Sequence, residues 1–146
     1  MRFWLAYRFS AADKGELRQQ LDRLRTLMQD AGYGVVSMIQ DIQNWEPWRQ
    51  PKVEVVRREY ELARECDAVL CIYTGFEPSE GRGWDAGFFA GMGKPTVMAI
   101  HKSIILPYYE ALFTENPANA KFGLPPVIRY ETFADIAEAL KPKEEK

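Results

Sequence analysis

Residues 68–73 (AVLCIY) are apolar at every position, which constrains the fold more than any other stretch of the chain. Such a run is typical of a strand buried on both faces, as in the centre of a parallel sheet covered by helices on each side. Other apolar runs of strand length alternate with segments whose apolar residues recur at helical spacing. The expected further strands are 3–7, 35–39, 95–100 and 127–130.

The expected helices fit between these strands. Ser10 or Asp13 can cap the first, whose apolar face comprises Leu17, Leu21, Leu24 and Met28 and which ends near Gly32. The others are expected at 53–66, 83–92, 107–113 and 132–140. The order predicts an α/β three-layer sandwich with a mostly parallel, five-stranded, flavodoxin- or Rossmann-like sheet. We expect one domain over residues 1–140, followed by a disordered charged tail, 141–146.

The overall charge and composition narrow the choice of partners. The 146 residues include 19 basic and 21 acidic side chains without a basic stripe, which argues against a nucleic-acid partner. No apolar run is long enough to span a membrane, and no signal peptide is recognisable, so we expect a cytoplasmic protein. With two cysteines and one histidine, neither a metal site nor another cofactor is expected.

The segment that follows the central strand, 79–87 (SEGRGWDAG), is the most informative part of the sequence. Gly81 and Gly83 would let backbone N–H groups approach a ligand, and a helix N-terminus favours negative charge. Asp85 is expected in the first helical turn, where an ionised carboxylate could attack or stabilise an electron-poor sugar carbon. A plain turn, with Asp85 as a helix cap, is equally compatible with these residues.

Residues 66–102 (CDAVLCIYTGFEPSEGRGWDAGFFAGMGKPTVMAIHK) resemble the signature of the nucleoside 2-deoxyribosyltransferase superfamily, which includes the deoxynucleoside 5′-monophosphate N-glycosidases. The matching pattern is an acid that opens an apolar strand, a Gly-x-Gly segment, an acid-x-Gly on a helix and a final Gly-Lys-Pro. The positions that fit are Asp67, Gly81, Gly83, Gly87 and Gly93-Lys94-Pro95.

The resemblance implies roles for three residues. The family's catalytic glutamate falls on Asp85, its sugar-holding carboxylate on Glu59, and the phosphate-contacting serine of the monophosphate hydrolases on Ser79. The order of the two acids is reversed here, because the family usually has Asp at the first position and Glu at the second. A tyrosine common on the family's first strand would fall at Phe3 or Trp4, so no phenol is expected there.

Four further side chains are candidates with competing interpretations. Arg8 follows the first strand and could bind a phosphate, although a surface salt bridge is equally plausible. Trp45 and Trp48 could stack on a base as a lid, or fill a gap or a subunit contact. His101 ends the fourth strand, and a lone histidine is more often structural than catalytic.

These observations favour an enzyme that cleaves or transfers at the N-glycosidic bond of a nucleoside or its 5′-monophosphate without a cofactor. The expected partners are that small molecule and a second copy of the chain in a homodimer or larger homo-oligomer. One alternative is a nucleotide-binding module that has lost catalysis, which the Asp at position 85 favours. Another is a TIR-like NAD hydrolase, because a strand, "YRFS" and an amphipathic helix also open those domains.

Overall fold

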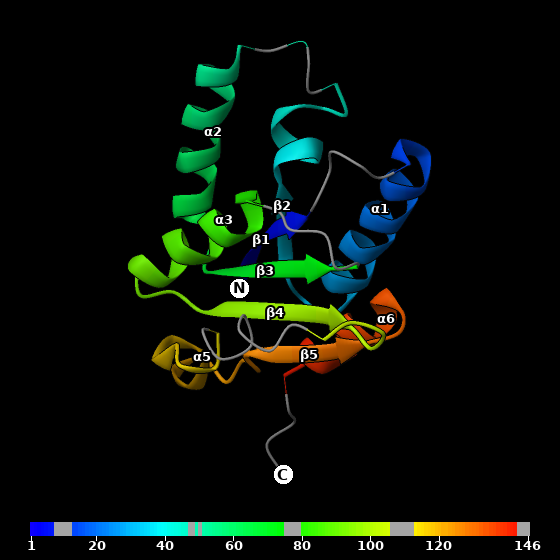
Figure 1. Ribbon diagram of the computed structural model, residues 1–146, viewed down its shortest axis with the longest axis vertical. Coiled ribbons are helices and arrows are strands. Elements are labelled where there is room, and N and C mark those ends of the chain that lie inside the picture. The colour runs from blue at the N-terminus through cyan, green and yellow to red at the C-terminus, as the bar shows by residue number, and fades with distance from the viewer. Residues whose placement is uncertain (8–12, 47–48, 50, 75–79, 106–112, 143–146) are drawn as a thin grey trace.

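A computed structural model describes residues 1–7, 13–46, 49, 51–74, 80–105 and 113–142. Its five strands form one parallel sheet in the order β2-β1-β3-β4-β5 (Figure 1). The strands are β1 (Arg2–Tyr7), β2 (Gly34–Ser37), β3 (Ala68–Tyr73), β4 (Thr96–His101) and β5 (Val127–Tyr130). The helices are α1 (Lys14–Asp30), the π-helix η1 (Met38–Ile42), α2 (Lys52–Glu65), α3 (Glu80–Gly91), α5 (Pro117–Lys121) and α6 (Phe133–Leu140). The predicted fold class is confirmed.

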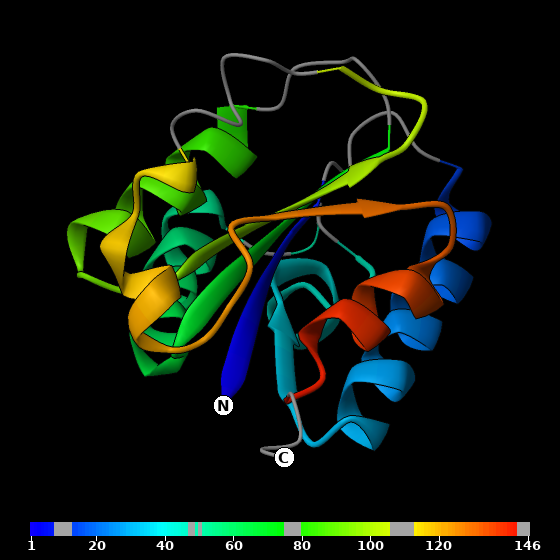
Figure 2. The ribbon, with the colours of Figure 1, turned by 90° about the horizontal axis from the view of Figure 1, so that it is seen from below.

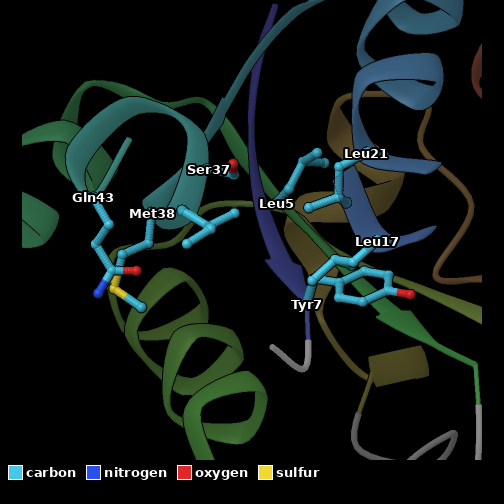
Figure 3. A pocket seen from close by; sticks show the side chains of 8 residues that line it. Leu5, Tyr7, Leu17, Leu21, Ser37, Met38 and Gln43 are labelled. Carbon is cyan, nitrogen blue, oxygen red and sulfur yellow. The ribbon is translucent and has the colours of Figure 1, made fainter. Parts of the chain in front are cut away.

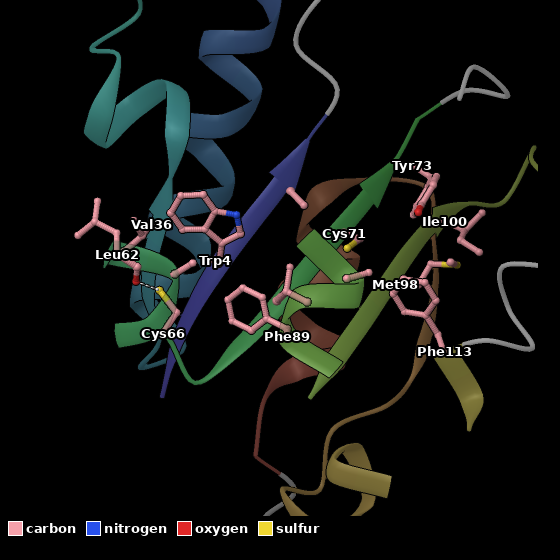
Figure 4. Close-up of a cluster of buried hydrophobic side chains, with 14 of the residues drawn as sticks. Trp4, Val36, Leu62, Cys66, Cys71, Tyr73, Phe89, Met98, Ile100 and Phe113 are labelled. Carbon is pink, nitrogen blue, oxygen red and sulfur yellow. Dashed lines mark hydrogen bonds between the residues drawn. The ribbon is translucent and has the colours of Figure 1, made fainter. Parts of the chain in front are cut away.

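The helices cover both faces of the sheet, with α1 and α6 on one side and α2 and α3 on the other (Figure 2). β3 lies in the centre and every one of its residues is buried, as its uninterrupted apolar sequence predicts. Alternate residues of β1 point to opposite faces. Phe3 and Leu5 pack in the core under α1 and α6, whereas Trp4 and Ala6 pack in the core under α2 and α3 (Figure 4).

Helix α1 follows the predicted pattern. Leu17, Leu21, Leu24 and Met28 are its buried residues. Asp13 is the cap, since its carboxylate accepts a hydrogen bond of 2.9 Å from the Glu16 backbone N–H. Ser10, the other proposed cap, lies outside the described residues.

The second strand is shorter than predicted, because the chain turns into η1 after Ser37. The Ser37 hydroxyl accepts from the Gln40 backbone N–H at 3.3 Å, and the Asp41 carboxylate accepts from the Ser37 backbone N–H at 2.8 Å. These side-chain hydrogen bonds satisfy backbone N–H groups and so compete with continued pairing of the strand in the sheet. Met38, predicted as part of the strand, therefore lies in a helical turn beside the sheet.

Helix α3 begins at Glu80, three residues before its predicted start. The predicted start of this helix at residue 83 is therefore wrong, because residues 80–82, which include Gly81, are already helical. Arg82 helps to explain the earlier start: its guanidinium is buried, donates to the Ile72 carbonyl at 2.8 Å and lies 4.0 Å from the Tyr73 ring centroid. These contacts tie the first turn of α3 to the end of β3.

The Gly-Lys-Pro segment has a structural role here. Gly93 ends the helix with a positive φ of 70°, which favours glycine. The Lys94 ammonium donates to the carbonyls of Arg64 and Cys66, each at 2.7 Å. Lys94 therefore binds the carbonyls at the C-terminus of α2, where a cation is favourable. Asp67 is structural too, since its carboxylate accepts from the Arg2 backbone N–H at 2.7 Å.

Replacing Lys94 by methionine should lower the free energy of unfolding by about 1–2 kcal/mol, because two hydrogen bonds to a charged donor are lost. Chemical denaturation at pH 7 measures the effect. Lys52→Met is the control, because the Lys52 ammonium has no hydrogen bond or ion pair to any described residue. Equal stability of the two variants would contradict the capping role.

No helix in the described part of the chain is long and apolar enough to cross a membrane. The same residues contain no group of three or more His, Cys, Asp or Glu side chains arranged to hold a metal ion.

Candidate functional site

Two acids predicted from the sequence, Glu59 and Asp85, line one cavity of about 460 Å³. The volume is in the range of small-molecule sites. The cavity lies between η1, α2 and α3, beside the carboxyl ends of β2 and β3, where parallel sheets commonly bind ligands. Its lining residues are Met38, Val56, Glu59, Tyr60, Gly81, Trp84 and Asp85. Apolar and aromatic side chains thus surround a pair of carboxyl groups.

Three elements hold the carboxyl group of Asp85. Helix α3 carries the residue, and the Glu59 side chain on α2 forms a hydrogen bond with it. From β1, the indole Nε1–H of Trp4 donates to Asp85 Oδ2 at 3.3 Å. Trp4 is only 1% exposed, so the donor is fixed by the core. The arrangement leaves Asp85 with little freedom to rotate.

The surroundings of this pair raise the pKa of both carboxyl groups. Burial raises the pKa of Asp85 to about 7, and the nearby negative charge of Glu59 acts in the same direction. The hydrogen bond from Trp4 opposes the shift, because it stabilises the ionised form. Burial also raises the pKa of Glu59, while its hydrogen bond with Asp85 lowers it. Both shifts favour the protonated form, so the pair keeps a proton to a higher pH than two isolated carboxyl groups would.

Any reaction that needs an ionised Asp85 should therefore accelerate as the pH rises through about 7. The sign follows from the raised pKa, because Asp85 is protonated below this value and ionised above it. A pH–rate profile between pH 5 and 9 measures the midpoint. A rate that is already maximal at pH 5 would be incompatible with this pair.

The structure separates the two glycines of the predicted ligand loop. Gly81 lines the cavity that contains Asp85. Gly83 lines a different cavity of about 260 Å³, together with Gly87 and the exposed Ala90. Arg8, Ser79 and Trp48 lie outside the described residues, so their predicted contacts remain predictions.

Trp45 and His101 lie away from the two acids. Trp45 packs against Leu17, Leu21 and Ile39 on the α1 side, with the Arg18 guanidinium 5.3 Å from its ring centroid. This placement corresponds to the gap-filling interpretation. His101 lines a third cavity, of about 390 Å³, at the ends of β4 and β5. Its Nδ1 accepts from the Ser103 backbone N–H at 3.2 Å, and its ring contacts Tyr130 edge-on.

A small space next to the site is formed mainly by apolar side chains of β1, α1 and η1 (Figure 3). Its lining residues are Leu5, Tyr7, Leu17, Leu21, Ser37, Met38, Ile39 and Gln43. The volume of about 30 Å³ accommodates no more than water. Met38 lines both this space and the cavity of the acids, so it separates the ligand-sized cavity from the α1 side.

Sequence reasoning missed three aromatic residues of the site. At Trp4 the sequence predicted only the absence of a phenol, and the role of the indole N–H, which reaches Asp85 from the strand on which the family often has a tyrosine, was not foreseen. Tyr60 directly follows Glu59 in sequence, and Trp84 directly precedes Asp85. Both aromatic side chains line the cavity. Their positions next to Glu59 and Asp85 were the available signal. Sequence alone does not show that their rings turn toward the same space.

The fold and the site define a class: an α/β protein whose parallel sheet and two flanking helices hold a pair of carboxyl groups with raised pKa in a ligand-sized cavity. The family follows from the sequence. A sequence model described as nucleoside 2-deoxyribosyltransferase matches residues 6–121, which is most of the chain. The chain belongs to this family. A search of curated proteins found no match.

Solved structures of known activity share the fold. The CMP N-glycosidase of Clostridium botulinum is 17% identical, with a TM-score of 0.66 over 96% of this chain and 98% of its own. The 2-deoxyribosyltransferase of Bacillus psychrosaccharolyticus is 16% identical, with a TM-score of 0.64 over 94% and 90%. That of Leishmania mexicana is 19% identical, with a TM-score of 0.53 over 68% and 63%.

Proposed function

We propose that this protein cleaves or transfers at the N-glycosidic bond of a nucleoside or its 5′-monophosphate, with Asp85 as the nucleophile. The observation that carries the proposal is the convergence of Glu59 and Asp85 in one cavity of suitable size. Membership of the nucleoside 2-deoxyribosyltransferase family supports the class of reaction. The CMP N-glycosidase among the similar structures is consistent with a nucleotide as substrate.

The pair offers a route to an ionised Asp85 once substrate is bound. In the free protein, burial and the negative charge of Glu59 favour the protonated form of Asp85, which can donate to Glu59. A sugar hydroxyl that donates to Glu59 takes the place of this donor, and Asp85 then ionises by giving its proton to water. Glu59 thus positions the sugar, as the family resemblance implies. Trp4 still donates to Oδ2, which stabilises the carboxylate form.

The reaction proceeds in two displacements at the same carbon. An Asp85 oxygen forms a bond to C1′ as the C1′–N bond breaks, the bonding electron pair stays with the base nitrogen, and the base takes up a proton from water. Water or a second base then attacks C1′ and releases Asp85. An arriving water makes the protein a hydrolase, whereas an arriving base makes it a transferase.

Several features of the complete site belong to the same proposal. Ser79 and Arg8 would contact the 5′ end of the substrate, and Ser79 favours a 5′-monophosphate. Trp48 would stack on a base, and Trp45 would do so only if it left its place beside α1. A homodimer or larger homo-oligomer in the cytoplasm is the proposed working form.

The proposal is tested by incubating the purified protein with the four common deoxynucleosides, their 5′-monophosphates and CMP, and separating free bases by chromatography. We expect release of base from at least one substrate, and exchange when a second base is added if transfer operates. A folded protein that releases no base from any of them would refute the proposed activity.

The second candidate is a nucleotide-binding module without catalysis. The observation that favours it is the aspartate at position 85, which is one methylene shorter than the family's glutamate and whose pKa is raised by burial and by Glu59. Asp85→Glu separates the candidates: a change in turnover, upward or downward, indicates a catalyst. Nucleotide binding by thermal shift, with no turnover in either protein, indicates the binding module. An assay of NAD hydrolysis tests the TIR-like alternative.

A further inference from the structure

The cavity of the acids has an aromatic wall made by Tyr60 on α2 and Trp84 on α3. The two rings meet edge to face at 5.1 Å. Behind them Phe88 stacks nearly parallel on Trp84, with centroids 5.4 Å apart and planes inclined by 7°, and it meets Tyr60 edge-on at 5.3 Å. Each ring therefore touches the other two, and the wall is fixed before any ligand arrives.

Despite this packing, Trp84 is 46% exposed. Single exposed apolar side chains are common on protein surfaces, so the exposure of Trp84 is informative because the residue lines the cavity of the two acids. Trp84 immediately precedes Asp85 and lines the same cavity, so a molecule held by the two acids has its apolar parts within reach of the indole. Val56, also 45% exposed, extends the apolar surface at this cavity.

A ligand with both a hydroxyl-rich part and a planar aromatic part matches this surface. The carboxyl groups can accept hydrogen bonds from the hydroxyls, while the aromatic wall can stack on a planar π-system. Aromatic side chains stack on bases with little dependence on base identity. We propose that Trp84 is the stacking surface for the base of the substrate. This inference rests on the proposed function and names the residue that recognises the base.

The test measures binding of adenine, cytosine and 2-deoxyribose 5-phosphate by calorimetry to the wild type, Trp84→Ala, Trp84→Phe and Phe122→Ala. Phe122, which follows α5 and is not among the lining residues of the cavity, is the matched control because it is also 46% exposed. We expect Trp84→Ala to weaken base binding about 5- to 150-fold. Trp84→Phe should retain most of the affinity, and Phe122→Ala all of it. Sugar phosphate binding should change less than about twofold in every variant.

Any of three results would overturn the inference. The first is a wild type that binds neither base, and the second is unchanged base affinity in Trp84→Ala. The third is a change in molecular mass by light scattering in Trp84→Ala with base affinity intact, which would identify the aromatic wall as a contact between protein chains. If the protein binds bases through Trp84 but shows no turnover, this inference is supported and the proposed catalysis is refuted. The failure of one can therefore be told apart from the failure of the other.

Discussion

Asp85→Asn is expected to reduce turnover by about a thousandfold or more, because the amide cannot form the covalent bond to C1′. The substitution is conservative in shape. The asparagine carbonyl can still accept from the Trp4 indole, and its amide can donate to Glu59, so the geometry around the sugar should persist. Substrate affinity is therefore expected to stay within about tenfold of the wild type. Steady-state kinetics with the best substrate, together with a binding measurement, separates the two effects.

The same variant should be more stable than the wild type at pH 8. Burial raises the pKa of Asp85 from 3.8 to about 7 in the folded protein, so between these values the folded chain binds a proton that the unfolded chain lacks. The free energy of unfolding therefore falls as the pH rises from 3.8 to about 7. Above pH 7 the buried, ionised Asp85 destabilises the folded protein. An uncharged asparagine removes this loss. Thermal unfolding at pH 5 and pH 8 should show a larger gain in Tm at pH 8.

A loss of activity together with a gain in stability excludes unfolding as the cause. Asp135→Asn serves as the control, because this carboxylate caps α6 at a distance from the cavity and its pKa is lowered by backbone hydrogen bonds. It should keep turnover and lose stability. If Asp85→Asn retained more than about a tenth of wild-type turnover, Asp85 could not be the nucleophile.

Trp4→Ala is expected to destabilise the protein by about 3–5 kcal/mol, the cost of removing a buried large aromatic side chain. Trp4 is 1% exposed and packs in the core between β1 and the α2–α3 layer (Figure 4). Because the indole also donates to Asp85, the variant should lose activity as well. Chemical denaturation gives the stability, but alanine alone cannot separate packing from the hydrogen bond.

Trp4→Phe makes that separation, because it keeps a large apolar ring and removes only the N–H donor and part of the volume. We expect a smaller loss of stability, about 1–2 kcal/mol. Without the donor that favours the ionised form, the pKa of Asp85 should rise further, and the midpoint of the pH–rate profile should move upward. An unchanged midpoint in Trp4→Phe would show that the 3.3 Å contact has no influence on Asp85.

The sheet and its helices were predictable because each element has a clear local pattern. The apolar run of β3 and the four apolar residues on one face of α1 are sufficient to define their environments. The boundaries were less predictable where side chains compete with the backbone. Ser37 and Asp41 end β2 early through hydrogen bonds with backbone N–H groups, and Arg82 brings the start of α3 forward through a contact with β3.

The candidate site was predictable in part. The family pattern identified Glu59 and Asp85, and the structure brings them together. The pattern did not separate ligand-binding residues from structural ones: Gly83 faces a different cavity, and Lys94 binds the end of α2. The contact of Trp4 with Asp85 joins residues 81 positions apart. Such contacts depend on strand order and helix packing, which local periodicity does not encode.

The most direct test of the account is a search for the sugar bound covalently to the protein. The protein is incubated with a deoxynucleoside analogue fluorinated at C2′, which slows release of the sugar, and is then measured by intact mass spectrometry and peptide mapping. We expect an added sugar on Asp85 of the wild type and none on Asp85→Asn. Release of base by a wild type that never carries the sugar, or a sugar attached to another residue, would contradict it.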